Sequence, residues 1–130
     1  MDWTVDPDAP APASQQLVER CLAGLAQGAL TPGDRLPSVR GLAALALVNH
    51  NTVARAYREL EGLGVVKAQG GRGVFVTERG PEVASRHWQD ETEGRFRDAT
   101  RAALGAGHAI ESLIDVARGC CAPETGEQSA

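Results

Sequence analysis

Cysteine, aromatic side chains and long apolar runs are scarce in this chain of 130 residues. No apolar run approaches the roughly 18 residues that indicate a transmembrane helix, so we expect no membrane contact. The first residues, Met1 to Asp6, are acidic and lack the basic and then apolar order of a secretory signal. The three cysteines, of which Cys120 and Cys121 are adjacent, provide no disulfide framework. We therefore expect a small, soluble protein of the reducing cytoplasm.

Residue patterns that carry catalysis or bind metals are also lacking. The chain shows no paired nucleophile and base and no phosphate-binding loop. His50, His87 and His108 lie far apart, and together with the adjacent cysteines they match no metal-ligand spacing. A DNA-reading module and a large catalytic or ligand-sensing domain would not both fit into 130 residues. We expect no enzyme, no metal and no cofactor.

What the chain does have is a globular composition, 42% hydrophobic and 23% charged, with an uneven charge distribution. Its formal net charge is −4, and residues 1–34 and 80–130 each carry −4. Residues 35–79 hold seven basic and three acidic side chains, a net charge of +4. Because local charge governs affinity for phosphate, a polyanion would bind this middle third. A solvated charged face would have a similar composition.

Apolar periodicity divides the chain into five expected helices and one hairpin. The helices are expected over residues 14–27, 38–46, 51–63, 82–104 and 110–117, and the strands over 65–68 and 74–77. Ser14, Ser38 and Asn51 are N-cap candidates, and Gly70 to Gly73 form a flexible, cationic hairpin tip. We expect residues 1–78 to form one domain, 79–118 a helical region and 119–130 a flexible tail.

Three short helices followed by a two-stranded hairpin are the element order of a winged helix-turn-helix, a mainly α fold with a small β-hairpin wing. The second helix of the pair enters the major groove with its N-terminal residues at the base edges. Side chains able to hydrogen-bond bases or phosphates occupy that helix: Asn49, His50, Asn51, Thr52, Arg55 and Arg58. Val53, Tyr57 and Leu60 recur on the opposite face, which indicates a buried anchor.

Four segments follow one another in the order and spacing of a known family. They are Pro32 to Arg40, Val48 to Val53, Tyr57 to Glu61 and Gly70 to Val76. Over about residues 10–78 the chain resembles the GntR family of bacterial transcription regulators. The acidic, proline-rich entry and the short helical C-terminal region resemble the YtrA-like branch. In that branch two dimerising helices take the place of a large effector domain.

The resemblance implies DNA contacts at particular positions. Arg40 matches the family's phosphate- or base-contacting arginine, and Ser38 caps the same helix and can present its N-terminus to phosphate. Residues 49–52 fall on the turn and the start of the recognition helix, and Arg55 falls on its exposed face. The wing tip, which approaches the minor groove, comprises Gly71, Arg72 and Gly73. Arg35 and Arg58 complete the expected DNA-binding set.

Two positions depart from the family pattern. Leu47 stands where the turn between the two helices usually carries glycine. A non-glycine residue in the left-handed conformation costs about 1–2 kcal/mol, so the turn is expected to be reshaped or strained. Ala46 stands where a larger apolar residue is usual, which predicts a thin contact between the helices.

Simpler interpretations exist for the same residues. Asn49 or Asn51 can be a helix cap without any DNA contact. Arg55 can form an ion pair with Glu59 at i,i+4 on a solvated face. Arg72 can belong to an ordinary hairpin tip. Trp88 and Phe96 lie on one stripe of the 82–104 helix and indicate a dimer interface, an intramolecular core or, less simply, an effector pocket.

The preferred function is a homodimeric transcription regulator, most simply a repressor, that binds an inverted repeat in double-stranded DNA. The expected dimer interface consists of the apolar residues Trp88, Phe96, Ile110, Leu113 and Ile114. The resemblance suggests a transporter operon as the target and leaves open a small-molecule effector. The alternative is a winged-helix module that binds a protein without sequence-specific DNA binding.

Overall fold

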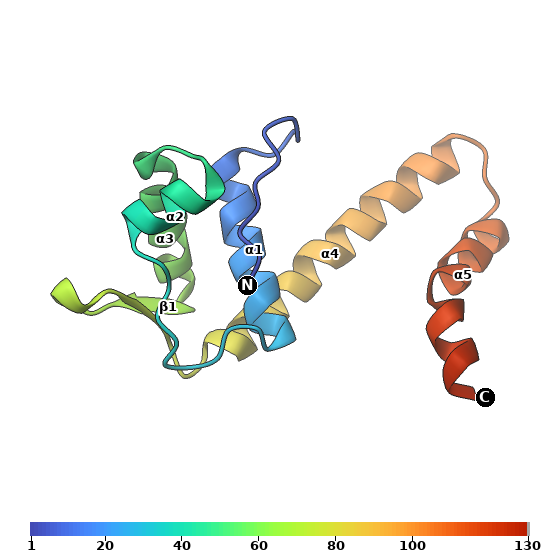
Figure 1. Ribbon diagram of the computed structural model, residues 1–130. Coiled ribbons are helices and arrows are strands. Elements are labelled where there is room, and N and C mark those ends of the chain that lie inside the picture. Colours follow the sequence, from blue (N-terminus) through green and yellow to red (C-terminus); the bar gives the residue numbers. More distant parts are fainter. Residues whose placement is uncertain (130) are drawn as a thin grey trace. The chain divides into compact units, whose positions relative to one another are not determined.

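The computed structural model describes residues 1–129, with side chains described through residue 121. Within these residues the helices are α1 (Ala13–Gln27), α2 (Val39–Ala46), α3 (His50–Leu63), α4 (Gly80–Gly105) and α5 (Ile110–Ser129). Strands β1 (Val66–Ala68) and β2 (Val74–Val76) flank a short 3-10 helix, η1 (Gly70–Arg72) (Figure 1). The element order confirms the predicted winged helix-turn-helix followed by two further helices. The chain divides into two compact units, Met1–Asp90 and Glu91–Ala130.

Helix α1 lies in the core of the first unit because one of its faces is apolar. Leu17, Cys21 and Leu25 recur at i,i+4 spacing and are at most 1% exposed. The helix begins at Ala13, so Ser14 is a first-turn residue and not the predicted cap. The carbonyl oxygen of Pro12 already accepts a helical hydrogen bond from the Gln16 amide at 3.0 Å.

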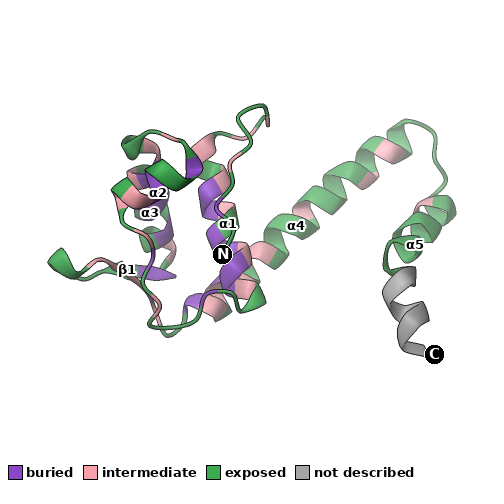
Figure 2. Ribbon diagram, in the orientation of Figure 1, coloured by how far each residue is buried: buried purple, intermediate pink, exposed green. Residues whose placement is uncertain are grey.

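Helices α2 and α3 pack through the apolar faces that the periodicity predicted (Figure 2). The Ser38 hydroxyl accepts a 2.9 Å hydrogen bond from the Gly41 amide and caps α2, as expected. The Asn49 side chain accepts a 2.7 Å bond from the Asn51 amide, so Asn49 and not Asn51 caps α3. Ala46, where the family usually has a larger apolar residue, is buried, with 8% of its surface exposed.

The turn between α2 and α3 keeps the left-handed geometry that glycine adopts without steric cost. Leu47 has φ 56° and ψ 49°, and it is the one described non-glycine residue with positive φ. Its side chain is 90% exposed, so no packing offsets the strain. Of the two expectations, a strained turn is the correct one.

The wing is a three-segment antiparallel arrangement. Strands β1 and β2 pair with Lys67 opposite Phe75, and Arg35 forms an isolated bridge with Phe75 on the other edge of β2. The Leu36 amide donates to the Val74 carbonyl at 2.8 Å, which ties the segment before α2 to the hairpin. The tip forms η1, where the sequence predicted only a flexible loop.

The N-terminal segment packs along α1, a feature that periodicity does not reveal. Trp3 is 8% exposed and belongs to the core cluster. The Gln16 side chain accepts a 2.8 Å hydrogen bond from the Asp6 amide and donates to the Asp6 carbonyl at 3.0 Å. Arg20 donates to the Thr4 carbonyl oxygen at 3.1 Å. These contacts hold the residues before Pro12 against the helix.

The boundary between the two units falls within α4, between Asp90 and Glu91. Residues 80–90 belong to the first unit, where Ala84 is fully buried. Helix α5 continues to Ser129, past the predicted end at residue 117. The predicted tail over 119–130 lies mostly outside the residues whose side chains are described, and its flexibility stays a prediction. Among the helices of the described part, none is long and apolar enough to cross a membrane.

Candidate nucleic-acid interface

Helix α3 separates a buried anchor face from a polar, solvent-facing side (Figure 2). Val53 and Leu60 are fully buried, and Tyr57 is 6% exposed. On the opposite side the predicted contact residues are exposed or half-buried: Asn49, His50, Asn51, Thr52, Arg55 and Arg58. The helix therefore presents polar side chains on a surface that its apolar face holds in place.

Tyr57 fixes α3 against the start of α2. Its hydroxyl donates a 2.6 Å hydrogen bond to the carbonyl oxygen of Pro37, which directly precedes the capping residue Ser38. Burial raises the pKa of the Tyr57 phenol, so the hydroxyl stays protonated and able to donate. This contact couples the position of the polar side of α3 to the N-terminal end of α2.

The ends of α2 and α3 carry two of the predicted residues as caps. The Ser38 hydroxyl and the side-chain Oδ1 of Asn49 each accept a hydrogen bond from a backbone amide, which for Asn49 supports the simpler interpretation as a helix cap. The side-chain nitrogen of Asn49, Nδ2, donates no hydrogen bond within the described residues, so its two N–H groups stay available. Asn51 is exposed and uses neither its oxygen nor its nitrogen in the described structure, so it retains both groups that adenine readout requires.

The wing brings Arg35 close to Gly73. A Cβ atom placed on Gly73 would lie 2.7 Å from the Arg35 Nε. Gly73 has φ 117° and ψ −166°, a conformation that only glycine adopts readily. Because Gly73 has no Cβ atom, the Arg35 side chain can lie directly against its backbone. Arg72 belongs to η1, whose residues are exposed.

The Glu61 side chain links α3 to the wing. It accepts a 3.2 Å hydrogen bond from the Ala68 amide of β1. The recognition helix and the hairpin are thereby held as one surface.

Most cationic side chains of this surface are exposed arginines. In the described part of the chain five predicted residues make neither hydrogen bonds nor ion pairs through their side chains: Arg35, Arg40, Arg55, Arg58 and Arg72. The alternative ion pair between Arg55 and Glu59 is not formed. All five arginines are exposed, so their charge is available to a polyanion.

The fold also brings residues together that sequence reasoning missed. A hollow of about 320 Å³ is lined by Asn51, Thr52, Arg55 and Arg58 of α3 and by Pro12, Ala13 and Ser14 at the start of α1. The packing of α1 on α3 creates this juxtaposition, and no local sequence signal reports it.

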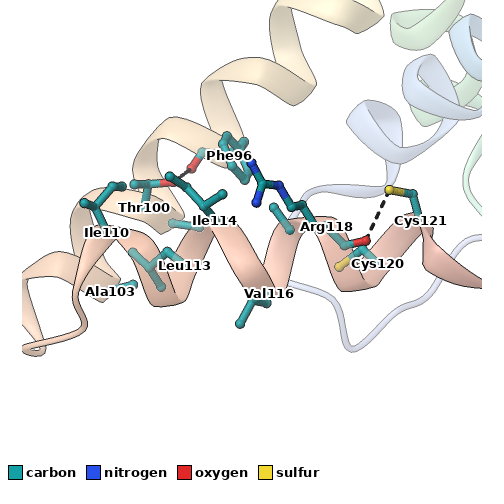
Figure 3. A pocket seen from close by; sticks show the side chains of 12 residues that line it. Phe96, Thr100, Ala103, Ile110, Leu113, Ile114, Val116, Arg118, Cys120 and Cys121 are labelled. Atoms are coloured by element: carbon teal, nitrogen blue, oxygen red, sulfur yellow. Dashed lines mark hydrogen bonds between the residues drawn. The ribbon is translucent and has the colours of Figure 1, made fainter.

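The second unit contains most of the predicted dimer residues. Phe96 is 63% exposed, Ile110 44% and Ile114 42%. Together with Leu113 these side chains line an apolar groove of about 550 Å³ between α4 and α5 (Figure 3). Trp88 lies in the first unit, where it is half-buried, so the structure does not group it with Phe96.

Residues 13–76 match the family described as bacterial regulatory proteins, gntR family. The transcriptional repressor YtrA of Bacillus subtilis is 39% identical over 74 residues, which span 57% of this chain and 57% of YtrA. The transcriptional regulator Rv1152 of Mycobacterium tuberculosis is 46% identical over 85 residues, which span 65% of this chain and 70% of that protein. The chain thus spans just over half of one relative and about two thirds of the other.

Solved structures are similar to most of the chain. A transcriptional regulator from Oenococcus oeni has a TM-score of 0.71 at 28% identity, covering 89% of this chain and 96% of that one. YtrA from Sulfolobus acidocaldarius, a GntR-family transcription factor, has a TM-score of 0.56 at 30% identity, covering 75% and 95%. With its helix-turn-helix, its wing and these relatives, the chain belongs to the GntR family of bacterial transcription regulators.

Proposed function

We propose that the protein is a homodimeric repressor that binds an inverted-repeat operator through α3 and the wing. The observation that carries this proposal is that the exposed arginines of α3, Arg55 and Arg58, make no side-chain hydrogen bond or ion pair in the described part of the chain. Repression is proposed because YtrA of Bacillus subtilis is a transcriptional repressor. The protein would act in the cytoplasm by covering the promoter, and the genes of a transporter are the proposed target.

The proposed role of each side chain follows from which of its polar atoms already form hydrogen bonds within the protein. Asn51 is the adenine reader, because its amide has both its acceptor and its donors free, whereas Asn49 uses its oxygen as a cap. Arg55, on the same exposed side, reads guanine. The remaining four arginines of the set supply charge to the DNA backbone and the minor groove: Arg35, Arg40, Arg58 and Arg72.

The groove between α4 and α5 is the proposed dimer interface. Phe96 and Val116 are exposed by 63% and 66%, and large apolar side chains of this kind are stabilised when a second copy covers them. A two-fold axis between the copies would direct two α3 helices to half-sites about one DNA turn apart. The dimer therefore explains both the apolar groove and the expected symmetry of the operator.

The experiment that tests the proposal selects bound fragments from a pool of randomised duplexes. The wild type is expected to enrich an inverted repeat, and Arg55→Ala to relax the preference at one base pair of each half-site. A bidentate contact of this kind discriminates by about 1–3 kcal/mol. Arg86→Ala, which removes an exposed charge of α4, is the control and should keep the preference.

The alternative function, a protein-binding winged-helix module, predicts a different result. In that case no sequence is enriched at moderate salt, and DNA binding shows no specific component. If the wild type and Arg55→Ala enrich the same sequences equally, Arg55 does not contact a base.

A further inference from the structure

The hollow between α1 and α3 has a mostly polar and cationic lining. Arg55 and Arg58 extend from α3, and Ser14 lies across from them in the first turn of α1. Neither arginine has a hydrogen bond or ion pair in the described structure, and no acidic residue lines the hollow. Two uncompensated positive charges thus face a polar space of about 320 Å³.

The wall on the α1 side adds hydrogen-bond donors to these charges. No side chain caps α1 at Pro12, and its first turn contains no acidic residue. The amides of Ala13 and Ser14, which line the hollow, precede the first helical hydrogen bond, which the Gln16 amide donates. The hollow therefore combines cations with backbone and hydroxyl donors, which suits an anion rich in oxygen acceptors.

The position of the hollow indicates where such an anion comes from. Asn51 and Arg55, which we propose to read bases, form part of its lining. A duplex whose base edges meet these side chains also brings its sugar–phosphate backbone against the same side of α3.

We propose that this hollow binds one backbone phosphate of each operator half-site, with Arg58 as its ion-pairing group and Ser14 as a hydrogen-bond donor. The inference rests on the proposed function and adds a contact from α1 to it. This contact positions α3 in the groove and carries no base preference.

The test combines a change in the protein with a change in single phosphates. In the selected duplex each phosphate is replaced in turn by an uncharged methylphosphonate, and affinity is measured for the wild type, Arg58→Gln and Arg86→Gln. At one phosphate of each half-site, neutralisation should weaken the wild type and Arg86→Gln by about tenfold, as expected for a charge-assisted hydrogen bond. Arg58→Gln should lose clearly less than the wild type at that phosphate, because its ion-pairing group is gone while Ser14 remains, and it should keep the losses elsewhere.

Two further measurements accompany the scan. Arg58→Gln should keep the wild-type base preference and lower the slope of log affinity against log salt by about 1 per protomer. Ser14→Ala should reduce the effect of the same methylphosphonate partially, because one donor is lost. Circular dichroism checks that each variant is folded; Arg58 is exposed, so its replacement leaves the core unchanged.

The outcomes separate this inference from the proposed function. If the wild type enriches an operator but Arg58→Gln shows no coupling to any phosphate, the inference fails and the proposed function stands. If no duplex is enriched, both fail. If inorganic phosphate at constant ionic strength shifts the amide resonances of residues 13–15 and the coupling is absent, the hollow binds a small anion, and the backbone assignment is wrong.

Discussion

The hydroxyl of Tyr57 and the carbonyl oxygen of Pro37 lie 2.6 Å apart, although the residues are 20 positions apart in the chain. This hydrogen bond joins the middle of α3 to the residue before the α2 cap. It helps to set the position of α3 relative to α2. The ring of Tyr57 is buried and Pro37 is half-buried, so the hydrogen bond forms in a partly dry environment.

Tyr57→Phe keeps the buried ring and removes only the hydroxyl. We expect the free energy of unfolding to fall by about 1–2 kcal/mol, because the Pro37 carbonyl loses its side-chain partner. Urea denaturation followed by circular dichroism measures the change. An unchanged midpoint would show that water replaces the hydroxyl without cost.

Leu47→Gly should stabilise the protein. The substitution removes a left-handed strain of about 1–2 kcal/mol, reduced by the greater freedom of glycine in the unfolded chain. The Leu47 side chain is 90% exposed, so little packing is lost. Leu45→Gly is the matched control, because Leu45 is also exposed but lies inside α2, where glycine costs about 1 kcal/mol. Opposite shifts of the melting temperature are expected for the two variants.

Gly73→Ala should destabilise the wing and displace Arg35. The backbone at Gly73 lies in a region of φ and ψ that costs other residues about 1–3 kcal/mol. An added Cβ would also meet the Arg35 Nε at 2.7 Å. Gly71→Ala serves as the control, since nothing lies within 4 Å of its Cβ position. Amide hydrogen exchange of β1 and β2 should be faster in Gly73→Ala than in the wild type and unchanged in Gly71→Ala. Equal exchange rates in the two variants would show that alanine causes no strain at position 73.

Phe96→Asp should prevent dimer formation, because a charge would be placed in the apolar groove between α4 and α5. Ala102→Asp changes an exposed residue of α4 that does not line the groove, and it should remain dimeric. Sedimentation equilibrium distinguishes the two masses. A dimeric Phe96→Asp would place the interface elsewhere.

Cys21 should resist alkylation in the folded protein. Burial raises the pKa of its thiol to about 12, so at pH 8 the reactive thiolate is scarcely populated. The neutral thiol favours the folded state below the usual thiol pKa of 9.0, and this contribution is lost as the pH rises towards 12. Mass spectrometry after iodoacetamide treatment should show label on Cys21 only in denaturant. Equal labelling rates with and without denaturant would show that the site opens readily.

The helices and their buried faces were predictable because helical periodicity is a local property. The spacing of Leu17, Cys21 and Leu25, and of Val53, Tyr57 and Leu60, identifies the core faces that the structure confirms. The boundaries shifted by a residue or two where caps compete, as Asn49 does with Asn51. Trp3 escaped prediction because a single tryptophan in an irregular segment has no period.

The candidate DNA-binding residues from Asn49 to Arg58 were identified from their types and positions on one helix, and the structure leaves their side chains exposed or half-buried. The candidates at the start of α2 and in the wing, such as Arg40 and Arg72, were expected from the resemblance to the family. Local patterns of residue type and spacing were therefore enough to identify the family, the element order and the chemistry of α3. They could not show that Ser14 faces Arg58 across a hollow, that Arg35 lies against Gly73 or that Trp88 and Phe96 belong to different units. Such pairings depend on how separate elements pack, because contacts between distant residues arise from the burial of whole faces and not from local spacing.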